Sequence, residues 1–70
     1  MEELTFGKLI EKLRKEKELT IQELANIANL SNVEISNIEN GKHSPRGLTI
    51  KKLAEALEYD YSKLYDASKK

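Results

Sequence analysis

The sequence predicts an all-α protein, a compact domain built from five short helices. Three observations support this fold class. Apolar residues recur at the spacing of an amphipathic helix along most of the chain. Two tetrapeptides, TIQE at residues 20–23 and SNVE at residues 31–34, have the form of helix capping boxes. The chain has 70 residues with apolar positions spread throughout, which fits one globular domain over residues 1–70 with a core over about residues 6–66.

The first helix is expected to begin after Thr5, a residue type that favours the N-cap position. From Glu11 to Glu18 opposite charges are interleaved, which is typical of a solvated helix face. The apolar residues of this segment stand at positions i, i+3, i+4 and i+7 and therefore share the opposite face: Phe6, Leu9, Ile10 and Leu13.

The second helix is predicted by its capping box. The Thr20 hydroxyl and the Glu23 carboxylate can each accept a hydrogen bond from the other residue's backbone N–H. The helix should run from Ile21 to about Ala28, and Asn29 tolerates the left-handed conformation in which helices commonly end. We expect its buried side to consist of Leu24, Ala25, Ile27 and Ala28.

The third helix is expected to start at Ser31, which forms the second capping box with Glu34. It should run to about Asn40, with Gly41 at its C-cap. Because these two helices are short and only a tight turn separates them, about residues 20–40 are predicted to form a helix-turn-helix.

The last third of the chain is predicted to contain a loop and two further helices. Pro45 forces an extended conformation on the residue before it, so residues 42–47 should be a loop. Helical spacing of apolar residues then places a fourth helix, and Asp60 can cap a fifth. The residues that carry these two helices are Ile50, Leu53, Ala54 and Leu57, followed by Leu64 and Tyr65.

The composition excludes several classes of function. The chain has no cysteine, and His43 is its only histidine, so we expect neither disulfides nor a metal site. It contains no nucleophile–base pair or phosphate-binding loop and is too short for a deep pocket, so we expect no enzyme, no cofactor and no small-molecule ligand. It has no apolar run of membrane-spanning length and no signal pattern at its N-terminus, which predicts a cytoplasmic protein.

The charges sum to zero but are unevenly distributed. Residues 21–41 hold three acidic residues and no basic one, whereas residues 42–70 hold seven basic and four acidic residues. A zero net charge does not favour a nucleic-acid partner. Any surface for a polyanion should therefore lie just after the third helix, where four basic residues precede the next acid: Lys42, Arg46, Lys51 and Lys52.

A helical wheel with about 100° per residue separates the two sides of the third helix. Ile35 and Ile38 define the inward side, which also takes Ser31 and Glu39. Asn32 lies at the edge of the outward side, in the first turn. The outward side itself carries no charge and consists of Val33, Ser36, Asn37 and Asn40.

The outward side suits contact with DNA bases, although each residue also has an ordinary explanation. An Asn side chain can donate and accept at the exposed edge of adenine, and Val33 could touch a thymine methyl group. Single apolar residues and asparagines are equally common on protein surfaces that bind nothing. Glu34 already has a local role as the capping-box carboxylate.

Four segments together resemble the Cro/phage-repressor helix-turn-helix family, also called the Xre type. They are LTIQELA at residues 19–25, NLS at 29–31, ISNIENGKHSP at 35–45 and KLAEAL at 52–57. The resemblance covers about residues 6–66. It implies a lambda-repressor-like five-helix fold that regulates transcription, usually as a repressor. The third helix would enter the major groove of double-stranded DNA, and a homodimer would bind a two-fold symmetric operator.

The resemblance also implies roles for individual residues. Base-edge contacts are expected from Asn32, Val33 and Asn37, with Ser36 nearby. Phosphate contacts are implied for Asn40 and Lys42, at the end of the third helix. The free N–H groups at the start of the second helix add an expected phosphate contact there, with Thr20 and Gln22. The charge of Arg46 and the hydrogen-bonding ring of His43 predict further phosphate contacts from the following loop. Gln22 stands one residue after the position where the family often has Gln, and a solvent-exposed histidine would explain His43 as well.

Two further expectations concern structure. Arg14 and Glu39 match a pair that ties the first helix to the third in this family. A dimer surface is expected on the fifth helix, at Tyr61, Leu64 and Tyr65, with the loop before the fourth helix. Glu58 stands where a helix-ending glycine is common. The rival hypothesis is a protein-binding module on the same fold, such as an antitoxin, which the acidic balance of residues 21–41 favours.

Overall fold

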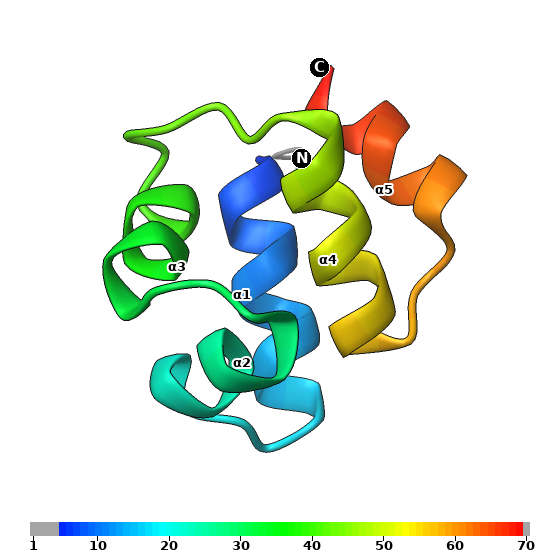
Figure 1. Ribbon diagram of the computed structural model, residues 1–70. Helices are drawn as coiled ribbons and strands as arrows, with labels where there is room; N and C mark the ends of the chain where they lie inside the picture. The colour runs from blue at the N-terminus through cyan, green and yellow to red at the C-terminus, as the bar shows by residue number, and fades with distance from the viewer. Residues whose placement is uncertain (1–4, 70) are drawn as a thin grey trace.

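A computed structural model describes residues 5–69 as five helices (Figure 1). The all-α prediction is confirmed, because every regular element in this range is a helix. The shorter helices α2 and α3 are separated by a three-residue turn, as the two capping boxes predict. The elements are α1 (Phe6–Glu16), α2 (Ile21–Ala28), α3 (Asn32–Glu39), α4 (Gly47–Leu57) and α5 (Tyr61–Ser68).

Side chains cap four of the five helix N-termini. The Thr5 hydroxyl accepts from the Lys8 N–H at 3.1 Å, and an Asp60 carboxylate oxygen accepts from the Lys63 N–H at 3.0 Å. Both predicted capping boxes are formed in full, at the starts of α2 and α3. Within residues 5–69, α4 alone starts without a side-chain hydrogen bond at its N-cap, which is Arg46.

A residue in the left-handed backbone conformation follows each of the helices α1, α2, α3 and α4. In the part of the chain that the structure describes, Gly41 has φ 74°, and three residues with side chains also have positive φ: Glu18, Asn29 and Glu58. After Asn29, the Leu30 N–H donates to the Ala25 carbonyl at 2.8 Å, which is a Schellman-type closure. Glu58 ends α4 in the same way, so the helix terminates with a strained residue where glycine would be relaxed.

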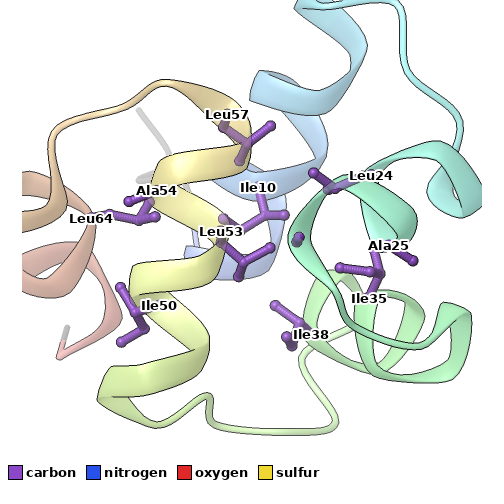
Figure 2. Packing of buried hydrophobic residues seen from close by; sticks show 11 residues of the cluster. Ile10, Leu24, Ala25, Ile35, Ile38, Ile50, Leu53, Ala54, Leu57 and Leu64 are labelled. Atoms are coloured by element: carbon purple, nitrogen blue, oxygen red, sulfur yellow. The ribbon is translucent and has the colours of Figure 1, made fainter.

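The hydrophobic core lies where α1, α2, α3 and α4 meet. Figure 2 shows Leu53 of α4 and Ile10 of α1 near its centre, and neither side chain is accessible to solvent. α3 packs on α1 and α2, α2 also packs on α4, and α5 packs on α4. Among the described residues, the eleven buried apolar ones are Ile10, Leu24, Ala25, Ala28, Ile35, Ile38, Ile50, Leu53, Ala54, Leu57 and Leu64.

Two expectations about this core are wrong. Ile27 is 57% exposed, because it projects roughly 100° away from the middle of the side of α2 defined by Leu24, Ala25 and Ala28. Leu64 was expected in a dimer surface, but it is fully buried against α4 and cannot present its side chain to a second chain.

Among residues 5–69, none of the five helices combines the length and the apolar character that a membrane span requires.

Candidate nucleic-acid interface

The outward side of α3 is accessible and uncharged. Val33 is 66% exposed, Asn32 and Asn40 are exposed, and Ser36 and Asn37 are half-buried. Ile35 and Ile38 are buried, as the helical wheel predicts. Ser31 is exposed, contrary to the wheel. As the N-cap it lies outside the helical geometry on which the wheel is based.

Both acidic residues of α3 are held by intramolecular hydrogen bonds. The Glu34 carboxylate accepts from the Ser31 N–H at 3.0 Å, and the Ser31 hydroxyl accepts from the Glu34 N–H at 3.0 Å. Glu39 lies on the other side of the helix and is turned toward α1. The side of α3 around Val33 therefore carries amides, a hydroxyl and one branched apolar side chain.

Arg14 ties the end of α3 to α1 and to the loop between α1 and α2. Its Nε donates to Glu39 Oε2 at 2.7 Å, and a terminal nitrogen donates to Oε1 at 3.1 Å. Its other terminal nitrogen donates to the Leu19 carbonyl at 2.8 Å. The side chains of Arg14 and Glu39 are only 10% and 7% exposed, and the hydrogen bonds to Glu39 raise the pKa of Arg14. This is the pair that the resemblance implies, and it orients the outward side of α3.

Gly7 is a positioning residue that sequence reasoning missed. A Cβ atom at this position would overlap the Ile38 carbonyl oxygen and lie 2.6 Å from the Glu39 carbonyl oxygen. The absence of a side chain therefore lets α1 touch the backbone at the end of α3. A glycine inside a helical pattern is the available signal for such a close approach.

The basic loop after α3 is attached to the end of that helix. The Lys42 N–H donates to the Asn37 carbonyl at 2.9 Å, across Gly41 in its left-handed conformation. Lys42, His43 and Arg46 are all exposed. A hollow of about 210 Å³ between α3 and the loop is lined by Glu34 and Ile38, by residues 43–46 and by Thr49. The positive charge thus lies beside α3 but not on it.

The start of α2 supplies a second polar edge. Thr20 and Gln22 are exposed. The capping box satisfies the N–H groups of Thr20 and Glu23 at 2.8 and 3.1 Å. Helix geometry leaves the N–H groups of Ile21 and Gln22 without an intrahelical acceptor. Asn40, at the C-cap of α3, donates weakly to the Ser36 hydroxyl at 3.4 Å.

No group of three or more potential metal ligands occurs among residues 5–69.

On α5, Tyr61 is 41% exposed and stacks on half-buried Tyr65, with ring centroids 5.7 Å apart.

A family model described as Helix-turn-helix matches residues 10–64, which include all of α2, α3 and α4. This chain belongs to the helix-turn-helix family, of the Xre/Cro type. The HTH-type transcriptional repressor RghR of Bacillus subtilis (strain 168) is 48% identical over 61 residues, which are 86% of this chain and 45% of that protein. A second B. subtilis relative, the uncharacterized HTH-type transcriptional regulator RghRB, is 42% identical over 64 residues, or 90% of this chain and 46% of that protein. The chain thus spans a little less than half the length of either relative.

Solved structures show the same helix-turn-helix fold. The restriction-modification controller protein C.AhdI from Aeromonas hydrophila superposes with a TM-score of 0.81 at 30% identity, over 84% of this chain and 89% of that one. The DNA-binding domain of the P22 c2 repressor superposes with a TM-score of 0.84 at 28% identity, over 93% of this chain and 86% of that one. The lambda-repressor-like fold class is therefore confirmed.

Proposed function

We propose that this chain represses transcription by binding a two-fold symmetric operator as a homodimer, with α3 in the major groove. The observation that carries the proposal is the uncharged outward side of α3. Both carboxylates of this helix, Glu34 and Glu39, are held by intramolecular hydrogen bonds. An exposed carboxylate on that side would repel the phosphate backbone. The arrangement leaves the bases to neutral side chains and the phosphates to the flanking charges.

Base recognition falls to four side chains in this proposal. Asn32 and Asn37 can each form paired hydrogen bonds with the adenine edge, and Val33 can contact a thymine methyl group. Ser36 can donate to or accept from a neighbouring base. These chemistries favour A·T pairs at the central positions of each half-site.

Phosphate contacts surround these four residues. Lys42 and Arg46 supply positive charge from the loop, and His43 supplies a hydrogen bond. Asn40 reaches the backbone from the end of α3. The start of α2 contributes Thr20, Gln22 and the free N–H groups of the first turn, since helix N-termini attract phosphate.

The homodimer follows from the number of contacts. The described chain extends 30 × 23 × 21 Å, so one copy covers about one half-site, and half-sites of this class lie about one DNA turn apart. Two copies double the base contacts without a second binding motif. Tyr61 and Tyr65 remain candidates for the dimer surface, whereas Leu64 supports them from the core.

The substitution Asn37→Ala tests the base-reading role of α3. We expect it to cost about 1–3 kcal/mol on the selected operator and to relax the preference at one base position. Binding to random DNA should change little. Fluorescence anisotropy with both DNAs measures the two affinities, and an equal loss on both would assign Asn37 to the backbone contacts.

A second candidate function is a protein-binding module with weak intrinsic affinity for DNA. Two observations favour it. Residues 21–41 contain three acidic residues and no basic residue, and the apolar side chain of Ile27 is exposed. A gel shift at low salt on A·T-rich palindromes discriminates the two functions. A retarded band supports operator binding, and free DNA at every protein concentration supports the protein partner.

A further inference from the structure

Asn40 differs from the other asparagines of the chain in the residue that follows it. Four of the five asparagines precede a branched apolar residue, whose side chain crowds its own backbone nitrogen. These four are Asn26, Asn29, Asn32 and Asn37. Asn40 instead precedes Gly41, and both residues are exposed. Because glycine has no Cβ, no side chain shields the Gly41 nitrogen from the side-chain amide of Asn40.

This arrangement allows the Asn40 amide to be lost as ammonia. The Gly41 nitrogen gives up its proton to water and attacks Asn40 Cγ. The N–Cγ bond forms, the Cγ–Nδ2 bond breaks, and Nδ2 takes a proton from water and leaves as ammonia. A second water opens the five-membered ring. Attack at Cγ gives Asp, and attack at the backbone carbonyl carbon gives isoaspartate, so either product carries a carboxylate in place of a neutral amide.

The native geometry at the end of α3 holds this reaction back. Ring closure requires the Gly41 nitrogen to eclipse Asn40 Cβ about the Cα–C bond. At the observed ψ of 1° the Gly41 nitrogen eclipses the Asn40 backbone nitrogen instead. The Gly41 N–H also donates to the Ile38 carbonyl at 3.2 Å, and Asn40 Nδ2 donates to the Ser36 hydroxyl at 3.4 Å. The reaction therefore requires the end of α3 to open.

Opening at this place involves little of the fold. Residues 40–44 are all exposed, and none of them belongs to the hydrophobic core or packs against it. Opening breaks the hydrogen bonds that the N–H groups of residues 40–42 donate to the carbonyls of Ser36, Ile38 and Asn37. A helix end with exposed backbone opens at a much lower free energy than the core. The folded chain therefore reacts through a local opening of this end.

Both products change the edge of α3 that faces phosphate in the proposed function. A carboxylate at position 40 offsets the charge of Lys42 and repels phosphate. It also stands at the C-terminal end of a helix, where the helix dipole disfavours negative charge. Isoaspartate adds one carbon to the main chain between α3 and the loop, which displaces Lys42 and Arg46 relative to the helix. Asn32 and Asn37 keep their amides.

We propose that the Asn40–Gly41 pair is a deamidation site that limits the lifetime of the DNA-binding surface, and that bound operator protects it. The inference rests on the proposed function, in which Asn40 and Lys42 contact phosphate. Bound phosphate holds both residues in the closed geometry, so copies on the operator keep the Asn40 amide. Free copies open, convert and lose affinity.

Mass spectrometry of the full chain, followed by peptide mapping, measures the conversion at neutral pH. Conversion should occur at Asn40 well before it occurs at any other asparagine. It should be at least about tenfold slower in native buffer than in guanidinium chloride, because only open chains react. Asn40→Gln is the matched control. Its amide is kept, but the corresponding ring has one more member and closes more slowly, so this variant should stay unconverted over the same period.

Fluorescence anisotropy measures the consequence for operator binding. Asn40→Asp should raise the dissociation constant for the selected operator at least about fivefold, because it replaces a phosphate contact with a repulsive charge. Ser62→Asp makes the same change in net charge at an exposed position of α5 and should bind like the wild type. Saturating operator should slow the conversion of wild-type Asn40 at least about threefold.

Three results overturn this inference and leave operator binding standing. The first is a native chain in which Asn40 converts no faster than Asn32 and Asn37. The second is an Asn40→Asp variant that binds the operator like Ser62→Asp, and the third is a conversion rate that saturating operator leaves unchanged. Fresh wild type that binds no DNA overturns the proposed function and the role given to this site, even if Asn40 converts.

Discussion

Replacing Gly7 with alanine should displace α3 and lower stability. The added Cβ would overlap the Ile38 carbonyl oxygen and lie 2.6 Å from the Glu39 carbonyl oxygen and 2.9 Å from the Glu39 carbonyl carbon. Ordinary contact begins near 3.4 Å. The two helices must therefore separate by roughly 1 Å, since both obstacles are backbone atoms that no side-chain rotation can move.

The magnitude follows from two opposing effects. Overpacking of this kind costs about 1–3 kcal/mol, and the better helix propensity of alanine returns up to about 1 kcal/mol. We expect a net loss of about 1–2 kcal/mol in the free energy of unfolding. The Arg14–Glu39 hydrogen bonds span the same contact, so the outward side of α3 should also shift and operator affinity should fall.

Urea unfolding followed by circular dichroism measures the loss, and Gly47→Ala is the matched control. A Cβ at Gly47 would meet only the Tyr61 hydroxyl, at 3.5 Å, so this variant should be as stable as the wild type or slightly more stable. The reasoning is refuted if Gly7→Ala unfolds at the same urea concentration as Gly47→Ala.

Three further predictions concern α3, the turn before α2 and the loop. Glu39→Gln should destabilise the chain by about 3 kcal/mol, because it leaves the nearly buried Arg14 charge without its carboxylate; unchanged urea unfolding would contradict this. Glu18→Gly should stabilise by about 0.5–1 kcal/mol, since Glu18 has φ 58°; a lower thermal midpoint would show that the side chain contributes more than the strain costs. Arg46→Ala should reduce the slope of log binding constant against log salt by about one, and an unchanged slope would remove Arg46 from the phosphate contacts.

Local patterns in the sequence predict the helices well. The capping boxes at Thr20 and Ser31 place the starts of α2 and α3, because a cap involves residues only three positions apart. The period of Ile50, Leu53 and Leu57 identifies α4 for a similar reason. These signals depend on neighbours within one turn and are little affected by the rest of the fold.

Contacts between residues far apart in the sequence are mispredicted or not predicted at all. Ile27 looks like core by residue type, but the packing of α2 on α3 and α4 turns it outward. The expectation of Leu64 in a dimer surface fails because nothing in the sequence shows that α5 folds back onto α4. Gly7 meets α3 more than thirty residues away; the glycine signals a close approach, but the sequence does not show which segment approaches.

The sequence predicts which residues lie on the outward side of α3, but not which base each of them contacts. The wheel finds the outward side of α3 correctly, because Ile35 and Ile38 identify the inward side. Which of Asn32, Val33, Ser36 and Asn37 touches which base depends on how α3 lies in the groove. That orientation depends on the phosphate contacts of α2 and of the loop.

Selection of bound sequences from a random double-stranded DNA pool tests the central claim most directly. The claim is that the uncharged outward sides of two α3 helices read bases while the flanking residues hold the phosphates. It predicts an enriched, two-fold symmetric site with A·T-rich half-sites centred about 10 base pairs apart. A pool that stays unenriched after repeated rounds, although the protein is folded, would contradict it.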